Sequence, residues 1–402
     1  MNIFRRIYCR SYQGVFRALL PFLPYREPKL LKNYTELARL LKENKIKNVL
    51  LVTDKTIYSL GLTKEMESRL QKYDINCFVF SDTVANPTTD NVDDALKMYK
   101  ENNCMALIGL GGGSSMDCAK AVGALVVNKN KTLNQMKGLL KVRKKLPLLI
   151  AIPTTAGTGS ETTVASVIVD SKTRHKYAIN DFVLIPDYAL LDAKLTINLP
   201  PFVTATTGMD ALTHAVEAYI GKSTTKDTRF ESLFAIKLIF ENLFEAYSNG
   251  KNNLEARQNM LLASYNAGLA FTKSYVGYVH AIAHSLGGKY NVAHGLANAV
   301  ILPIMLKIYG KSVHKKLWKI SVFLGLCDKS TSYENGAKEF ISAIEELNRC
   351  MNIPTFIEEL REEDIDELAF HADKEGNPLY PVPKLMNKKE LKEIYYKLLK
   401  KD

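Results

Sequence analysis

The stretch from Gly208 to Gly295 constrains this chain more than any other, because it concentrates residues that can bind a metal. It holds Asp210 and four of the seven histidines, which are His214, His280, His284 and His294. The first two stand four residues apart, and so do the next two, in apolar Gly/Ala-rich sequence without proline. Residues four apart lie one turn above each other on a helix face. The pattern predicts two helices that close around a divalent metal.

The donor types narrow the chemistry. A single histidine on an apolar face is usually a core residue, but five donors, four of them in two i,i+4 pairs, favour metal binding. One carboxylate and three imidazoles suit Fe(II), Zn(II), Mn(II) or Co(II), and no thiolate biases the choice. A metal held in this way keeps an open position, where it acts as a Lewis acid. The residues alone do not decide which of His280 and His284 is the ligand.

Length and composition favour a globular protein of two domains. The chain has 402 residues, of which 47% are hydrophobic and 24% charged. No apolar run reaches about 18 residues, so a membrane-spanning helix is not predicted. The six cysteines are scattered without a CxxC pair. This pattern disfavours a zinc–cysteine site and a disulfide framework, and it favours a reducing cytoplasm.

Residues 1–30 read as a basic N-terminal arm. Residues 1–50 hold eleven Lys or Arg and three Glu, and the first acidic residue is Glu27. The stretch IFRRIYCRSYQGVFRALLPFL could be an amphipathic helix on an anionic membrane or a partner protein, or an arm that is solvated or packed in an oligomer. Arg17 interrupts the apolar part and no A-x-A pattern follows, so a signal peptide is disfavoured. No nucleic-acid motif accompanies the charge, so nucleic acid is not an expected partner.

Residues 31–199 predict an α/β domain. Apolar runs at 49–54, 77–81, 105–114 and 148–161 alternate with helical stretches, which is typical of a parallel sheet with helices on both faces. Ligands of such sheets bind at the carboxyl ends of the strands. SVIVD and the segment through YALLD (188–192) could be further strands or a hairpin.

Residues 200–402 predict a second, all-α domain. The character of the sequence changes near Leu199-Pro200-Pro201, and the segments beyond it have helical patterning. The predicted helices of the first half of this domain span 207–220, 227–247, 253–271, 279–287 and 295–309.

The run at 105–114 ends in a glycine loop. Its sequence, GLGGGS, leads into a helix, where backbone N–H groups and the helix dipole can hold a phosphate. The dinucleotide fingerprint is only half met, because Ser114 replaces the third glycine and no acid follows about 20 residues later. Asp54, at the end of an earlier strand, could bind the adenosine ribose and favour NAD over NADP; a helix N-cap is the alternative role.

Together these motifs resemble the iron-containing (group III) alcohol dehydrogenase family. GGGSSMD, IPTTAGTGSE, GMDALTHAVEAY and HAIAHSLGGKYNVAHGLANA match its signature segments in order and spacing, and the resemblance covers roughly residues 35–400. It implies a Rossmann-like N-terminal domain, a helical C-terminal domain, an active site in the cleft between them, and a homo-oligomer such as a dimer.

The resemblance also implies site residues. His284 would be a proton-relay or substrate-orienting residue beside the metal. The metal ligands would be Asp210, His214, His280 and His294. The NAD site would comprise Asp54, Asn86, Gly112, Gly113, Ser114, Asp117, Thr154, Thr155, Thr163 and Lys176.

The implied function is an NAD(H)-dependent alcohol dehydrogenase or aldehyde reductase. It would act on a small primary alcohol or diol whose oxygen is bound to Fe(2+), with Zn(2+) as the other candidate metal. The alternatives are a zinc polyol dehydrogenase resembling glycerol dehydrogenase, a dehydroquinate-synthase-like lyase, and a non-catalytic binding protein. Two segments depart from the family: PKLLKN (28–33) lacks the usual FGxG-like turn, and ADKEGNPLYPVPK lacks the Arg common after the first proline.

Overall fold

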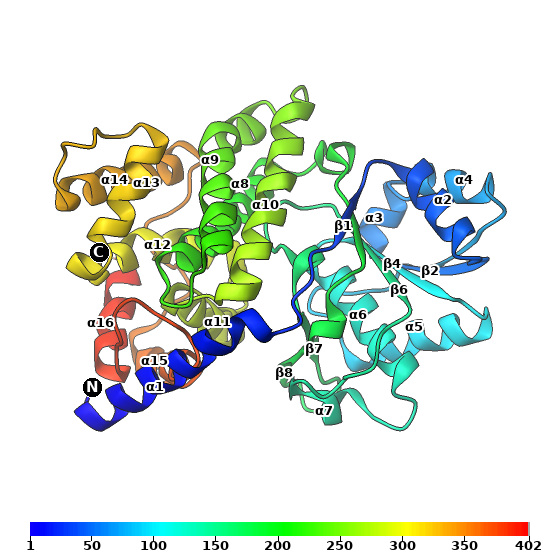
Figure 1. Ribbon diagram of the computed structural model, residues 1–402, viewed down its shortest axis with the longest axis horizontal. Helices are drawn as coiled ribbons and strands as arrows, with labels where there is room; N and C mark the ends of the chain where they lie inside the picture. Colours follow the sequence, from blue (N-terminus) through cyan, green and yellow to red (C-terminus); the bar gives the residue numbers. More distant parts are fainter. Residues whose placement is uncertain (401–402) are drawn as a thin grey trace. The chain divides into compact units, whose positions relative to one another are not determined.

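Two compact units make up the protein in the computed structural model, which describes residues 1–400 (Figure 1). Pro24–Asn198 forms an α/β unit. Met1–Leu23 and the chain from Leu199 onward form a helical unit. The predicted fold class, a parallel α/β domain followed by a helical domain, is confirmed.

A six-stranded, fully parallel sheet forms the centre of the α/β unit. The four apolar runs of the sequence are neighbouring strands in this sheet. Strands that are buried on both faces read as continuous apolar runs rather than alternating ones. Across the sheet, the strands are β1 (Lys29–Leu31), β9 (Tyr188–Leu190), β6 (Leu148–Pro153), β4 (Ala106–Gly111), β2 (Asn48–Val52) and β3 (Asn76–Phe80).

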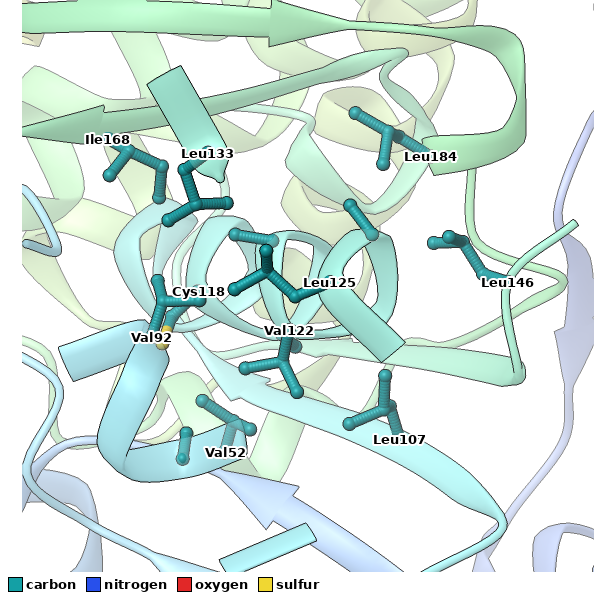
Figure 2. Close-up of a cluster of buried hydrophobic side chains, with 14 of the residues drawn as sticks. Val52, Val92, Leu107, Cys118, Val122, Leu125, Leu133, Leu146, Ile168 and Leu184 are labelled. Carbon is teal, nitrogen blue, oxygen red and sulfur yellow. The ribbon is translucent and has the colours of Figure 1, made fainter. Parts of the chain in front are cut away.

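Successive residues of these strands enter two different hydrophobic cores. Leu50 of β2 belongs to the core that Figure 2 shows, which α5 and α6 complete with residues such as Val92 and Val122. Leu51 belongs to the opposite core, where α2 and α4 contribute residues such as Leu37. The helices of this unit are α2 (Tyr34–Glu43), α3 (Lys55–Ser59), α4 (Lys64–Gln71), α5 (Thr89–Glu101), α6 (Gly113–Val127) and α7 (Leu133–Met136).

A small second sheet resolves the two strand predictions that were left open. SVIVD lies in β7 (Ala165–Val169), which pairs with β8 (Lys176–Asn180) as an antiparallel hairpin, and β5 (Gly138–Leu139) adds to β8. The segment 188–190 instead joins the main sheet as β9. Single turns of 3-10 helix link several elements: η1 (Leu20–Phe22), η2 (Ser160–Thr162), η3 (Phe182–Leu184), η4 (Ala193–Thr196), η5 (Gly310–Ser312) and η6 (Glu362–Asp364).

The helical unit is organised around α8 (Pro201–Ile220). This helix is buried on nearly every side, because α9, α10 and α12 all pack against it. A helix that is apolar all round needs such an environment. The other helices of this part are α9 (Lys226–Ser248), α10 (Leu254–Ser274), α11 (Tyr278–Tyr290), α12 (His294–Tyr309), α13 (His314–Leu324), α14 (Tyr333–Cys350), α15 (Ile365–Gly376) and α16 (Lys388–Leu398).

The N-terminal segment forms a helix, α1 (Ile3–Leu19), that belongs to the helical unit. Its inner side is polar: Arg5 forms an ion pair with Asp373, and Gln13 donates hydrogen bonds to the carbonyls of Pro378 and Tyr380. Among residues 1–400, no single helix is long and apolar enough to cross a membrane. One bent pair, 294–312 with 314–324, reaches that length and composition only when its two helices are combined.

Candidate functional site

The helix α8 places Asp210 and His214 one turn apart in the interior of the helical unit. Both side chains are buried. Their spacing of four residues puts them on one face of the helix, as the sequence predicts. Polar groups in such an apolar environment need partners, which the neighbouring helices α11 and α12 supply.

His280 of α11 and His294 of α12 complete the cluster. One ligand atom from each of Asp210, His214, His280 and His294 lies within 4.8 Å of all the others. A close helix contact makes this possible: a Cβ on Gly295 would stand 2.2 Å from the carbonyl oxygen of Thr206 on α8. The absence of a side chain at this position lets α12 bring His294 Nε2 within 3.4 Å of Asp210 Oδ1.

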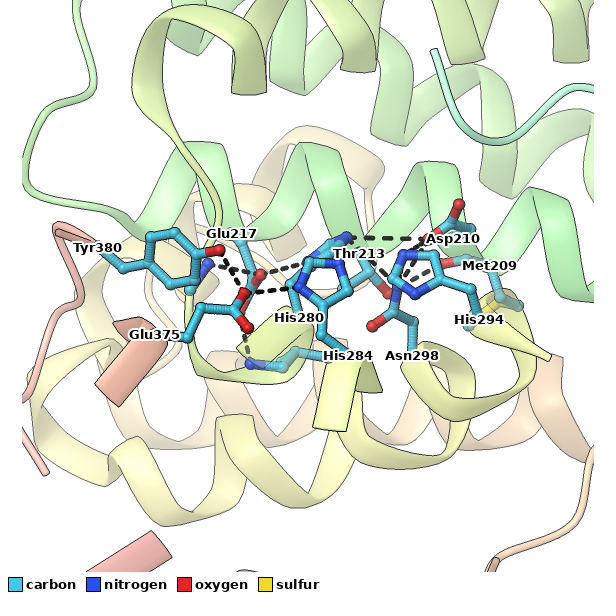
Figure 3. A network of polar contacts seen from close by, with 12 residues as sticks. Met209, Asp210, Thr213, Glu217, His280, His284, His294, Asn298, Glu375 and Tyr380 are labelled. Carbon is cyan, nitrogen blue, oxygen red and sulfur yellow. Dashed lines mark hydrogen bonds and ion pairs between the residues drawn. The ribbon is translucent and has the colours of Figure 1, made fainter. Parts of the chain in front are cut away.

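Glu217 orients His280 from behind. Its Oε2 lies 2.7 Å from His280 Nδ1, and its two oxygens also accept the backbone N–H groups of Gly277 and Val279 (Figure 3). With the carboxylate as acceptor, Nδ1 carries the hydrogen and Nε2 presents its lone pair to the cluster. Burial raises the pKa of Glu217 to about 7 against the opposing effect of these donors. Burial also lowers the pKa of His280 well below its usual value, so the ring is neutral, the form that binds metals.

Asn298 lies at the point where the side chains of Asp210, His280 and His294 converge. Its Nδ2 is 2.6 Å from Asp210 Oδ1, 3.1 Å from His294 Nε2 and 3.3 Å from His280 Nε2, and its side chain is fully buried. The amide group thus supplies partial positive charge to a set of converging acceptors. A carboxylate and three imidazoles around one point fit a divalent transition metal such as iron or zinc.

His284 stands beside this cluster and has its own partners. Its ring stacks on that of His294, with centroids 5.1 Å apart, and its Nδ1 lies 2.6 Å from Glu375 Oε1. The same oxygen of Glu375 accepts the hydroxyl of Tyr380 at 2.6 Å. Burial favours a higher pKa for Glu375, but the charge and hydrogen bond of His284 lower it on balance. His284 is therefore backed by a carboxylate, while a different residue, His280, joins the four-donor cluster.

The glycine loop of the α/β unit lies at the junction of β4 and α6. Gly111 has φ of +153°, and a Cβ there would collide with Ser115 Oγ at 2.4 Å, so this turn requires glycine. Gly112 is the N-cap of α6, and Gly113 and Ser114 form the first turn. Four predicted residues of the cofactor site, Asp54, Gly112, Thr154 and Thr155, thus fall just beyond the carboxyl ends of β2, β4 and β6.

The residues that follow β2, β4 and β6 lie close to one another. Thr154 N donates to Gly111 O at 3.0 Å, and a Cβ on Gly112 would have Thr155 Oγ1 as its nearest neighbour at 3.8 Å. Asp54 caps α3 through Oδ1, which is the alternative role that the sequence allowed. Its other oxygen, Oδ2, lies next to Gly111.

The remaining predicted residues form two smaller groups. Asn86 donates from its backbone to Ser114 Oγ and accepts from Lys176 Nζ. Asp117 is turned inward, where it accepts from Ser160 Oγ at 3.0 Å and from the backbone N–H of Val167 at 3.1 Å. Burial raises the pKa of Asp117. Asp117 thus fixes the loop before β7.

A buried lysine that was not among the predicted site residues holds the threonine-rich loop. Lys120 Nζ donates to the backbone carbonyls of Ser160, Thr163 and Ala165 and to two side-chain hydroxyls, one of which is Thr163 Oγ1. Burial lowers its pKa to about 8, and the neighbouring Glu161, also buried, has its pKa raised to about 7. A lysine in the apolar sequence CAKAVGALVV was the available signal. Glu217 and Asn298 were also missed, although each lies at helical spacing from a predicted metal ligand.

Comparisons with known proteins agree with this architecture. Residues 32–193 match the family described as iron-containing alcohol dehydrogenase. Residues 204–399 match the C-terminal region of the Fe-containing alcohol dehydrogenase family. The chain belongs to the iron-containing alcohol dehydrogenase family. It is an enzyme, and its general activity is that of an alcohol dehydrogenase.

Individual relatives cover nearly the whole chain. A 1,3-propanediol dehydrogenase of Citrobacter freundii is 36% identical over 389 residues, which cover 96% of this chain and 99% of that protein. An NAD-dependent methanol dehydrogenase of Bacillus methanolicus is 37% identical over 339 residues, or 84% of this chain and 88% of that protein. The crystal structure of a 1,3-propanediol oxidoreductase has a TM-score of 0.89 at 34% identity and covers 93% of this chain and 98% of that one.

Proposed function

We propose that this protein is an NAD(H)-dependent alcohol dehydrogenase, or aldehyde reductase in the reverse direction, that uses Fe(2+) to act on a small primary alcohol or diol. The convergence of Asp210, His214, His280 and His294 within 4.8 Å carries the proposal. The names of the relatives, which include a propanediol dehydrogenase and a methanol dehydrogenase, support a small alcohol as substrate.

The helical unit would hold the metal. When bound, Fe(2+) supplies Lewis acidity at a substrate oxygen. Asp210 offsets part of the charge of the cation, and Glu217 keeps His280 in the tautomer that presents Nε2. The interior is apolar, so these interactions act in a medium of low polarity where they are strong. The same four side chains are also suited to bind Zn(2+), so a zinc polyol dehydrogenase is the second candidate function.

The α/β unit would hold NAD. The backbone N–H groups at the start of α6 and the positive end of its dipole suit the pyrophosphate. Asp54 Oδ2 lies on the side of Gly111, where a carboxylate can accept the ribose hydroxyls and repel a 2′-phosphate, which favours NAD over NADP. A relative described as NAD-dependent supports the same choice.

His284 would move the proton. Its Nδ1 faces Glu375, so the neutral ring accepts a proton at Nε2, and the carboxylate stabilises the imidazolium that forms. Tyr380 keeps Glu375 in place through its hydroxyl. We also propose that the enzyme works in the cytoplasm as a homo-oligomer; the first of these is supported by six cysteines that are all free thiols.

Two single substitutions test this division of roles. His280→Ala should remove bound metal and lower turnover by more than about 100-fold, since even partners of metal ligands are worth about 10- to 100-fold. His284→Ala should retain the metal and lower turnover by about 100-fold or more, the usual range for general acid–base groups. The metal is measured by elemental analysis and turnover by NADH oxidation with short aldehydes.

His371→Ala is the matched control, because His371 is an exposed histidine of the same unit. It should leave both readouts unchanged. Equal loss of metal in the His280 and His284 variants would refute the separate roles. Reconstitution with Fe(2+) or Zn(2+), each assayed on aldehydes and diols, separates the iron enzyme from the zinc polyol dehydrogenase.

A further inference from the structure

The helix α1 carries most of its large apolar side chains on its solvent-exposed side. Phe4 is 80% exposed and Val15 is 62% exposed. We call this surface the outer face, and it consists of Ile3, Phe4, Ile7, Tyr8, Val15, Leu19 and Phe22. Isolated exposed apolar residues are common on proteins, but a contiguous stripe on one helix marks an interaction site.

The opposite side of α1 is fixed to the helical unit by polar contacts. Arg10 donates to the carbonyls of Val382 and Pro383, and Gln13 donates to those of Pro378 and Tyr380. Phe16 packs edge-on against Tyr275. These contacts leave the outer face in place as a rigid surface, so a partner can bind it without any movement of the helix.

The charged side chains of residues 1–26 are all positive. Residues 1–26 contain no Asp or Glu. Arg6 and Arg17 are exposed and lie along one border of the outer face, whereas Arg5 is paired with Asp373. An apolar stripe bordered by arginines matches the interior and the headgroups of an anionic lipid layer, in which such helices lie parallel to the surface.

The size of the outer face argues against a second copy of the chain as its occupant. A helix of 17 residues is about 26 Å long and about 10 Å wide, so it offers on the order of 300 Å². A stable protein–protein interface needs about 800 Å² from each partner. Two copies of α1 would also bring arginines together with no acidic residue of the segment to pair with them.

We propose that α1 docks this enzyme on an anionic membrane surface through its outer face, with Arg6 and Arg17 at the headgroups. The proposal is independent of the proposed catalytic function. Deletion of residues 1–25 would be a poor test, because it would also remove Arg10 and Gln13 from the loop that they hold. Substitutions on the outer face alone are the appropriate variants.

The test is co-sedimentation of the full-length protein with vesicles. Wild-type protein should sediment with vesicles of equimolar phosphatidylglycerol and phosphatidylcholine, and not with phosphatidylcholine alone. The double variant Ile7→Ser, Val15→Ser should lose binding. Arg6→Gln with Arg17→Gln should weaken it roughly 25-fold, since each basic residue near an anionic surface is worth about fivefold.

Phe230→Ser is the control, because Phe230 is an equally exposed aromatic residue on α9. It should bind as the wild type does. All variants should keep their melting temperature and turnover, because every substituted side chain is exposed. Failure of the wild type to bind, or equal binding by the outer-face variant, would overturn the proposal. The proposal would also be overturned if the wild type formed an oligomer that the outer-face variant did not form, and neither protein bound vesicles. The outer face would then serve self-association.

Discussion

The helical unit and the α/β unit present their functional groups by different means. In the helical unit, side chains from three helices converge in an apolar interior, and partners such as Glu217 and Asn298 fix their orientation. In the α/β unit, the glycine loop offers backbone N–H groups, and many nearby side chains hold the loops themselves. Lys120 and Asp117 both act in this way.

This contrast determines what each region tolerates. A site built from converging side chains depends on helix spacing, so one extra atom between two helices can separate the ligands. A loop built from backbone depends on the space in front of it, so a new side chain can leave the fold intact and still block a phosphate. The predictions below test the two halves of the contrast in order of expected effect.

The largest effect is expected from Gly295→Ala. The new methyl group would meet the carbonyl of Thr206 at 2.2 Å and push α12 away from α8, which separates His294 from Asp210. We expect a loss of bound metal of more than 10-fold and a stability loss of about 1–3 kcal/mol. Elemental analysis and thermal melts measure both.

Gly288→Ala is the matched control for this variant. Within the described residues, a Cβ at Gly288 has no neighbour inside 4 Å, and alanine favours a helix by about 0.5–1 kcal/mol over glycine. The control should melt at the same temperature or higher and keep its metal. Retention of metal by Gly295→Ala would show that helix spacing is not what assembles the ligands.

A smaller effect is expected from Glu217→Gln. The amide has one acceptor oxygen and one NH2 donor, so it cannot accept from the His280 ring and from both backbone N–H groups together. Metal affinity should fall about 10- to 100-fold, as measured by competition with a chelator. Glu241→Gln, at an exposed ion pair with Lys237, should have no effect. Unchanged metal affinity in the Glu217 variant would show that Glu217 does not contribute to metal binding.

Gly112→Ala probes the other half of the contrast. Gly112 has φ of −75°, which alanine adopts readily, and its new Cβ would approach only Thr155 Oγ1, at 3.8 Å. The melting temperature should stay the same, while the KM for NAD should rise about 10-fold, equivalent to about 1.4 kcal/mol of binding. Gly14→Ala on α1 is the control. An unchanged KM would mean that the pyrophosphate does not approach this loop.

The smallest effect concerns stability rather than activity. Because the pKa of Glu161 is about 7 in the fold and near 4.5 in the unfolded chain, the native state binds more protons between these values. The free energy of unfolding should therefore fall as pH rises from about 5 to about 7.5. Glu161→Gln should make this dependence shallower, by an amount equivalent to a few degrees in melting temperature, while Glu217, whose pKa is also raised to about 7, keeps its own contribution. A parallel pH profile in the variant would contradict the assignment.

The sequence revealed features that repeat at short spacing. The four apolar runs predicted the strands, and the i,i+4 pairs predicted the ligand helices, because both signals are local. The same logic would have found Glu217, three residues after His214, and Asn298, four residues after His294. An acid and an amide in otherwise apolar helices have few roles other than to orient buried polar neighbours.

Contacts between distant segments gave no such signal. Glu375 lies 91 residues from His284, and Asp373 lies 368 residues from Arg5. The orientation of α1 was also hidden, because an amphipathic pattern does not say which side faces the protein. Helices usually turn their apolar side inward, whereas α1 turns it outward and attaches itself through arginine and glutamine.

The attachment of α1 links two properties that are usually separate. Gln13 holds the backbone of Tyr380, whose hydroxyl holds Glu375, which in turn backs His284. Removal of these first residues would therefore disturb both the proposed membrane contact and the support of His284, whereas substitutions on the outer face would affect the membrane contact alone. Selection on either property would preserve the same 17-residue helix.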